Sequence, residues 1–319
     1  MIRAIHGVPV VRGLGRRLPV LACALAVLTV LAGCGSGPSQ AGAAAIVGDT
    51  AIPLSAVQNQ LNLVLNKEPA AQEALQQRKL DTAARQIVTL QVQHELIKQV
   101  ATNEHLVADQ HEVDALLAEG GGAEQASKGT VFDAAGVRQR SVDEVLLADL
   151  ARREIPGLAV TFDYTLVPDQ QQAEQIARRL AADPGSALAI IGSVGAGGSA
   201  GIGQRVVAAQ DIQDAAGTPL FGLDANTVAA FPASQESAQW LVVLITKRET
   251  QAPGDVDLSQ MDTQTLASVG LHLLEPHAQR VGIRINPRYG VWDPIGVQVS
   301  PSATESLGLQ LPAGIAVDQ

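Results

Sequence analysis

The stretch from Leu80 to Asn103 constrains the fold of this chain most strongly. Its pattern predicts one long helix, but the apolar side chains of that helix do not fall on a single stripe. They are Ile87, Val88, Leu90, Val92, Leu96, Ile97 and Val100. A helix that is apolar on most of its sides is usually covered by several neighbours. The sequence therefore predicts that this helix forms the centre of the first domain.

The first 33 residues have the parts of a secretory signal. It ends at Leu31-Ala32-Gly33, and Cys34 follows directly. An apolar run from Leu18 to Val30 follows a basic start, and small residues close it, as in exported proteins. The basic residues are Arg3, Arg12, Arg16 and Arg17. Cysteine directly after Leu-Ala-Gly resembles the lipobox of bacterial lipoproteins. That resemblance implies a diacylglycerol on Cys34 and a lipid-anchored position at the cell membrane, on its extracytoplasmic face.

Two other interpretations of the N-terminus remain. The segment 18–33 could be a transmembrane anchor, although its sixteen residues fall short of the ~20 needed to span a bilayer. It could also be an ordinary signal in which Cys34 is incidental. We prefer the lipoprotein, because acyl chains contribute about 0.8 kcal/mol per buried CH₂ and can hold a domain on a membrane. The rest of the chain then works outside the cytosol, without ATP.

Charge and cysteine content narrow the function classes. The formal net charge is −10, and removal of the four signal arginines leaves 18 basic and 32 acidic residues. An acidic chain of this kind argues against nucleic acid as a partner and against a polybasic membrane patch. Cys23 lies in the signal, so the mature chain has no disulfide and no cysteine-based metal site. The Ala-rich, Lys-poor composition favours a GC-rich genome such as that of an actinobacterium.

The chain divides by pattern into six parts. After the signal (1–33) we expect a flexible tether (34–43), and then a helical domain (44–155) that opens on two short strands within 45–52. Its other helices are expected from Ser55, a plausible N-cap, to Asn66 and over 109–118 and 137–154. Pro156-Gly157 marks the next boundary.

An α/β segment (156–252) follows, with a strand at 159–167 and a helix at 170–182. A glycine-rich loop (192–203) and short extended pieces at 206–209 and 220–221 come next. The apolar strand 241–245 suits the centre of a covered sheet. The part 253–295 carries a helix over 262–281 that Pro276 kinks or divides. A loose tail (296–319) ends the chain.

Two stretches resemble the SurA/PrsA family of secreted foldases. Val47-Gly48-Asp49-Thr50-Ala51-Ile52-Pro53-Leu54-Ser55 is similar to the family's opening turn and capped helix, and 106–113 is similar to the motif that follows its long helix. The resemblance implies an α+β fold: a mainly helical chaperone-like module with an apolar cradle, completed by a C-terminal helix, and an inserted small α/β parvulin-like domain. The helix 262–281 and the Asn286–Gly290 stretch would be the C-terminal return.

The middle segment resembles a parvulin prolyl isomerase domain that lacks the family's histidines. Tyr164 and Leu241 stand where the family has histidines, and segment 156–250 contains neither His nor Cys. We therefore assign no catalytic residue and expect no enzyme activity. The glycine loop lacks the Lys-Ser/Thr of a phosphate-binding loop, which argues against nucleotide.

The remaining polar and aromatic residues favour structural roles. The histidines at 94, 105, 111, 272 and 277 do not form an i, i+4 pair with a third ligand, so we expect neither a metal nor another cofactor. Arg288, Tyr289 and Trp292 have the composition of an interface hot spot, but we favour Trp292 as part of the core.

The expected function is an ATP-independent chaperone that binds unfolded exported polypeptides in an apolar groove. The groove would lie between the N-terminal helices and the helix 262–281. Its candidate lining residues are Leu61, Leu65, Val88 and Leu273. One alternative is a binding module for a single envelope partner; a second is an active peptidyl-prolyl cis-trans isomerase.

Overall fold

The computed structural model describes residues 40–67, 72–73, 80–194, 199–210, 217–234, 238–253, 256–258 and 261–314. Cys34 and the signal lie outside the described residues, as does the tether as far as residue 39. Residues 38–319 form one compact unit, and the following account concerns that unit. Both helices and sheets build it, as the α+β expectation requires.

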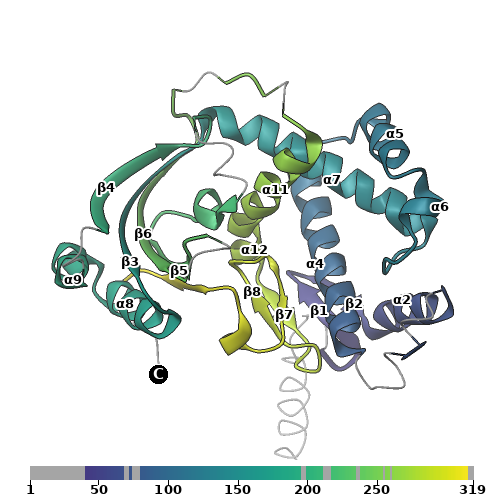
Figure 1. Cartoon of the computed structure of the whole chain (residues 1–319), viewed down its shortest axis with the longest axis horizontal. Coiled ribbons are helices and arrows are strands. Elements are labelled where there is room, and N and C mark those ends of the chain that lie inside the picture. The colour runs from purple at the N-terminus through teal and green to yellow at the C-terminus, as the bar shows by residue number, and fades with distance from the viewer. Residues whose placement is uncertain are drawn as a thin grey trace, which may run out of the picture. The chain divides into compact units, whose positions relative to one another are not determined.

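The long helix expected from the sequence is present as α4 (Asp81–Glu104). It ends at His105, whose left-handed backbone (φ 56°) lets its N–H reach the carbonyls of Ala101 and Thr102. Buried side chains lie on most of its sides, from Ala84 to Ala101. Its neighbours are β1 (Ala43–Val47), β2 (Thr50–Pro53), α2 (Leu54–Lys67), α7 (Ala134–Glu154), α12 (Glu275–Val281) and β9 (Gln298–Ser300). The prediction of a centrally placed helix is therefore confirmed (Figure 1).

A small sheet joins the N-terminal hairpin to the segment that follows α12. Its strand order is β2-β1-β7, and β7 (Ile283–Ile285) pairs antiparallel with β1. The hairpin expected within 45–52 is present and turns at Gly48, where φ is +58°. The following helix begins at Leu54, so Ser55 lies inside it and is not its N-cap.

Three other helices of this half begin directly after an aspartate. The side chains of Asp109, Asp133 and Asp262 each accept a hydrogen bond from a backbone N–H in the first turn, which satisfies a donor that has no partner within the helix. The helices that they cap are α5 (Gln110–Glu119), α7 and α11 (Thr263–Leu273), and a short α6 (Ala123–Ala126) precedes α7. Pro276 falls in the first turn of α12, so the expected division of the last helix is confirmed.

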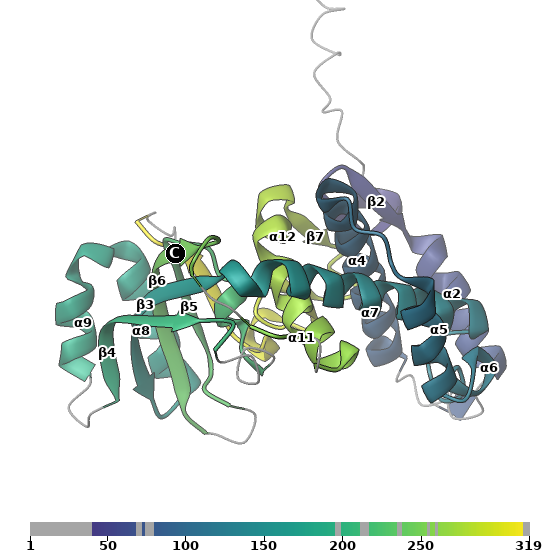
Figure 2. The same ribbon diagram turned by 90° about the horizontal axis from the view of Figure 1, so that it is seen from above.

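A five-stranded antiparallel sheet forms the other half of the unit (Figure 2). In spatial order it consists of β10 (Leu309–Pro312), β5 (Thr227–Pro232), β6 (Trp240–Glu249), β3 (Ala159–Val167) and β4 (Ala200–Val207). The helices α8 (Gln170–Ala182) and α9 (Ala187–Val194) share a core with one face. Val242 and Leu244 of β6 point to that core, whereas Val243 and Ile245 point to the opposite one. The apolar strand expected at the centre of a covered sheet is thus confirmed.

The structure corrects three expectations about this half and the C-terminal segments. Most of the expected glycine loop 192–203 belongs to α9 and β4, and its residues 195–198 lie outside the described ones. The piece at 220–221 is part of a 3-10 helix, η5 (Pro219–Gly222). The tail is not loose through residue 314, because β8 (Val291–Asp293) pairs with β9 and β10 pairs with β5. Since β10 completes one sheet edge, Leu311 is buried against the α8 core.

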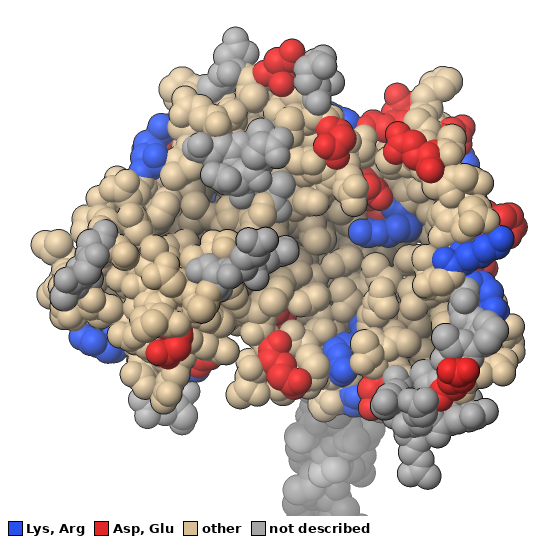
Figure 3. Space-filling view, viewed as in Figure 1, with Lys and Arg blue, Asp and Glu red and all other residues tan. Residues whose placement is uncertain are grey.

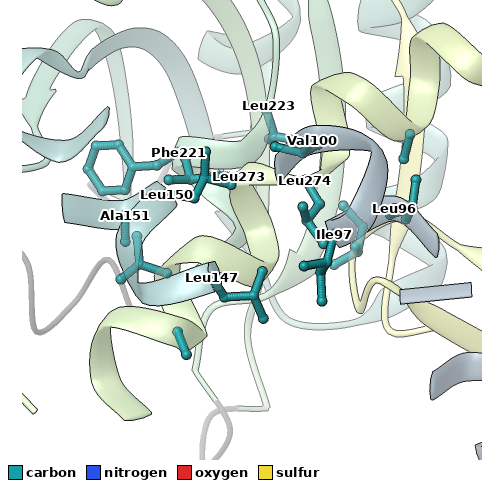
Figure 4. Packing of buried hydrophobic residues seen from close by; sticks show 14 of the residues in the cluster. Leu96, Ile97, Val100, Leu147, Leu150, Ala151, Phe221, Leu223, Leu273 and Leu274 are labelled. Carbon is teal, nitrogen blue, oxygen red and sulfur yellow. The ribbon is translucent and has the colours of Figure 1, made fainter. Parts of the chain in front are cut away.

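The main core continues from the helices to the sheet. Buried residues of α4, α7, η5 and α11 pack together in Figure 4, where Ile97, Leu147, Phe221 and Leu273 come from four different elements. The same cluster includes Val243 and Ile245 on the inner face of the sheet. The helices and the sheet therefore share apolar burial. Within the described part of the chain, no helix combines the length and apolarity needed to cross a bilayer.

Candidate functional site

Three hollows in the helical half share two lining residues, Val131 and Phe132, in the segment that leads from α6 to α7. Their volumes are about 370, 220 and 1000 Å³, and these two residues line all three. We call the three hollows together the Phe132 groove. Acidic and basic side chains both occur at the helical end of the face shown in Figure 3, so charges of one sign do not dominate there.

The C-terminal half of α2 holds the segment that carries Phe132. The Lys67 ammonium donates to the carbonyl oxygens of Ser127, of Thr130 at 3.3 Å and of Phe132 at 2.5 Å. The Gln60 amide donates to the carbonyl of Val131. A cation that bonds several carbonyls replaces the hydration that a loop backbone would otherwise need. These contacts position Phe132 where it lines all three hollows.

The 370 Å³ hollow has mainly apolar walls. Its apolar side chains come from β2, α4 and the segment before α7, and include Ile52, Ile87, Leu90, Val131 and Phe132. The side-chain oxygen of Gln91 is buried in this wall and has no hydrogen-bond partner among the described residues. An apolar cavity with a few unpaired amide groups suits an apolar side chain together with its polar backbone.

An ion pair joins α4 to α7 at the edge of this hollow. Nδ1 of His94 lies 2.9 and 3.0 Å from the two carboxylate oxygens of Asp143, which also accept from the Gln139 amide at 3.2 Å. The hydrogen bond to Asp143 raises the pKa of His94 despite the opposing effect of burial. Protonation of His94 would therefore strengthen the link between the two helices.

Beside this pair, Glu95 also remains ionised. Burial acts to raise its pKa, but hydrogen bonds from Gln99, Lys98 and Thr50 together hold that pKa below its ordinary value. Gln99 and Lys98 donate at 2.9 and 3.1 Å. The polar rim of the hollow is thus already hydrogen-bonded, which leaves its apolar wall as the surface for a ligand.

The largest hollow of the groove is more polar. Arg152 donates to Glu112 at 2.6 Å and to Asp149 at 2.8 Å, and the Thr263 hydroxyl also donates to Glu112. Burial acts to raise the pKa of Glu112, but these donors hold it below its usual value. Burial raises the pKa of Glu144 nearby. At this end of the groove, paired charges join α5 to α7, and the Thr263 hydroxyl joins α5 to the start of α11.

The lining residues chosen from the sequence occupy different positions from those expected. Val88 is 0% exposed and Leu273 is 4% exposed, so both lie in the closed main core and not on an open surface. Leu61 and Leu65 are partly buried on α2. Helical periodicity marked these residues as apolar, but it could not separate core positions from groove positions. Phe132 was missed because it lies between helices, where no period applies.

The two positions compared with the parvulin histidines carry a phenol and an aliphatic side chain, and neither carries an imidazole. Tyr164 and Leu241 are partly buried against the main core on neighbouring strands. The ring of Phe162 lies 5.9 Å from that of Tyr164. These side chains pack the inner face of the sheet.

The two histidines of the last helices, His272 and His277, lie among packed side chains. Burial lowers the pKa of His272 to about 4, and its Nδ1 has no partner among the described residues. Nε2 of His277 lies 2.9 Å from the Gln99 side-chain oxygen. The described residues contain no group of three or more potential metal ligands. Trp292 is partly buried and packs against the main core.

The fold and groove define an α+β protein in which a helical half and an antiparallel sheet share one core. No family model matches the chain, and no curated protein matches it. Among solved structures, the foldase protein PrsA from Streptococcus pneumoniae is a neighbour with 14% sequence identity, covering 73% of this chain and 92% of that one. The TM-score is 0.24. A likeness of this strength carries no argument, so the function is argued from the groove.

Proposed function

We propose that this protein is an extracytoplasmic, membrane-anchored lipoprotein that binds unfolded exported polypeptides in the Phe132 groove, without ATP. The observation that carries the proposal is that three hollows share the aromatic residue Phe132, and that the 370 Å³ hollow among them has mainly apolar walls. An unfolded, extended polypeptide exposes apolar side chains at intervals. Three neighbouring hollows suit such a polypeptide better than they suit one small molecule.

Binding would be driven by burial of client side chains. Each Å² of apolar surface removed from water contributes roughly 25 cal/mol, so a few side chains supply a weak, reversible affinity. The unpaired oxygen of Gln91 is placed to accept a hydrogen bond from a client backbone N–H. A chaperone that works without ATP needs such a modest affinity, because the bound polypeptide must also dissociate unaided.

Lipidation of Cys34 would keep the groove near the membrane from which clients emerge. The lipidation part of the proposal rests on the sequence Leu31-Ala32-Gly33-Cys34 alone. Mass spectrometry of the protein purified from membranes should find an acylated Cys34, and Cys34→Ser should release the protein from the membrane fraction.

The test of the groove is suppression of aggregation. The chain lacking its first 34 residues is mixed with a denatured envelope protein, and light scattering is followed. We expect suppression near equimolar addition. Phe132→Ser should weaken it several-fold, because the side chain common to all three hollows is lost.

A matched control is Leu188→Ser on α9, where the replaced leucine is 71% exposed and lies outside the groove. It should leave suppression unchanged, and circular dichroism should show both variants folded. Absence of suppression by the unaltered protein in large excess would contradict a general chaperone. Capture of one envelope protein would then favour the single-partner module. Catalysed prolyl isomerisation in a peptide assay would favour the isomerase.

A further inference from the structure

A second cavity lies away from the Phe132 groove and shares no lining residue with it. Its volume is about 560 Å³, and its walls come from α12, from the turn before β5, from β8 and from β10. The wall residues that matter here are Asp224, Glu275, Trp292 and Gln310. The cavity thus lies where the C-terminal segments meet the end of the sheet.

Two polar side chains in this wall lack partners. Glu275 is 3% exposed, and its Oε2 atom has no hydrogen-bond partner among the described residues. The side-chain oxygen and nitrogen of Gln310 are also buried without partners. An unpaired buried polar group costs about 1–3 kcal/mol, so two of them on one cavity indicate a ligand that supplies hydrogen bonds.

The two titratable groups that line the cavity are both acidic, and Arg248 and Arg280 share a neighbouring hollow with one of them, Asp224. Asp224 and Glu275 line it, and the lining residues include no lysine or arginine. Asp293 lies behind the wall and is fully buried; its carboxylate accepts from the N–H groups of Ile295 and Leu307 at 3.1 and 2.7 Å. Backbone donors thus hold the Asp293 carboxyl in place, and its charge acts on Glu275.

We propose that this cavity binds an organic cation, a primary ammonium or guanidinium group on an alkyl chain. Glu275 and Asp224 are its charge partners, the Gln310 oxygen accepts from its N–H groups, and the Trp292 indole, which can attract cations, lies in the same wall. The cation comes either from a free alkylamine or from a lysine or arginine side chain of a peptide. A metal ion fits less well, because the described residues hold no group of three potential ligands.

The state of Glu275 provides a signature of binding. Burial, together with the charges of Asp293 and Asp224, raises the pKa of Glu275 to about 8. The free carboxyl is then largely protonated at neutral pH, and a bound cation favours its ionised form. Binding should therefore release a proton to the buffer.

The test is isothermal titration calorimetry of the full chain in detergent micelles near pH 7, in two buffers of different ionisation enthalpy. The probes are n-pentylamine, butylguanidine and, as the neutral match, 1-pentanol. A short lysine-containing peptide and its norleucine analogue form the second arm. We expect the cations to bind with proton release and the alcohol not to bind.

Glu275→Gln replaces a protonated carboxyl by a neutral group of the same shape, so the fold should persist by circular dichroism. It should abolish proton release and lower the affinity about tenfold to a hundredfold, as for one charge-assisted hydrogen bond. Asp224→Asn should weaken binding too. Glu305→Gln, at an exposed carboxyl outside the cavity, should leave the affinity unchanged.

The two arms identify the source of the cation. Binding of the amine alone indicates a small-molecule site, and binding of the lysine peptide but not its norleucine analogue indicates a site for a basic side chain. The proposal is overturned if no cation binds, if 1-pentanol binds equally well, or if Glu275→Gln binds as tightly as the unaltered chain. None of these outcomes depends on aggregation assays, so the Phe132 groove proposal stands or falls separately.

Discussion

At the scale of single residues, aspartates act in two different ways in this protein. Asp109, Asp133 and Asp262 cap helices by local hydrogen bonds, which a sequence pattern can indicate. Asp143 instead bonds His94, 49 positions away in the chain. No spacing rule predicts such a pair, because the packing of α4 against α7 creates it.

The His94–Asp143 pair predicts a pH-dependent contribution to stability. The pKa of His94 is raised in the folded protein, so the pair stabilises fully below the ordinary value of 6.5 and loses that contribution as pH rises through the folded value. His94→Gln should therefore lower the free energy of unfolding more at about pH 5.5 than at about pH 8.5. The histidine side chain is 42% exposed, so we expect a difference of only about 0.5–1 kcal/mol.

Urea unfolding at both pH values measures this difference. In an Asp143→Asn background, His94→Gln should have the same effect at both pH values. A loss that does not vary with pH in the unaltered background would contradict the role of the ion pair.

At the scale of elements, the contact between α11 and α7 depends on one glycine. A Cβ built on Gly270 of α11 would lie 2.1 Å from the carbonyl oxygen of Leu147 on α7, which is shorter than any real contact. The helices can approach this closely only because residue 270 has no side chain. The sequence predicted both helices. It did not indicate which glycine lets them approach, because the distance between two helices depends on where they cross.

Gly270→Ala should therefore force α11 and α7 apart. The expected cost is about 1–3 kcal/mol in the free energy of unfolding, the range for overpacked cores, measured by urea titration. Gly192→Ala is the matched control, because its Cβ meets no atom within 4 Å on the exposed side of α9. That change should be neutral or stabilise by up to about 1 kcal/mol. Equal effects of the two substitutions would show that the close contact does not limit stability.

At the scale of the whole molecule, the helical half and the sheet should unfold together. The main core takes residues from both, so neither half keeps its apolar burial without the other. The chain has two tryptophans, Trp240 beside the α8 core and Trp292 beside the main core. When one tryptophan is replaced, the fluorescence of the remaining tryptophan reports on the core beside it.

In Trp240→Phe and Trp292→Phe, fluorescence and far-UV circular dichroism should give one common unfolding midpoint in urea for each variant. Two midpoints, with the Trp240 signal separating from the Trp292 signal, would contradict a shared core. That result would instead support an independent domain over 156–252, as the sequence pattern suggested.

The sequence by itself determined the positions of most helices, the central apolar strand, the break at Pro276 and the absence of cysteines after Cys34. These features follow from local periodicity and backbone chemistry. Only the tertiary structure decided that Val88 and Leu273 are core while Phe132 lines a groove, that β10 completes the sheet, and that Glu275 is buried without a partner. The physical reason is that burial and pairing depend on contacts between distant segments, whereas periodicity records only the neighbours along one element.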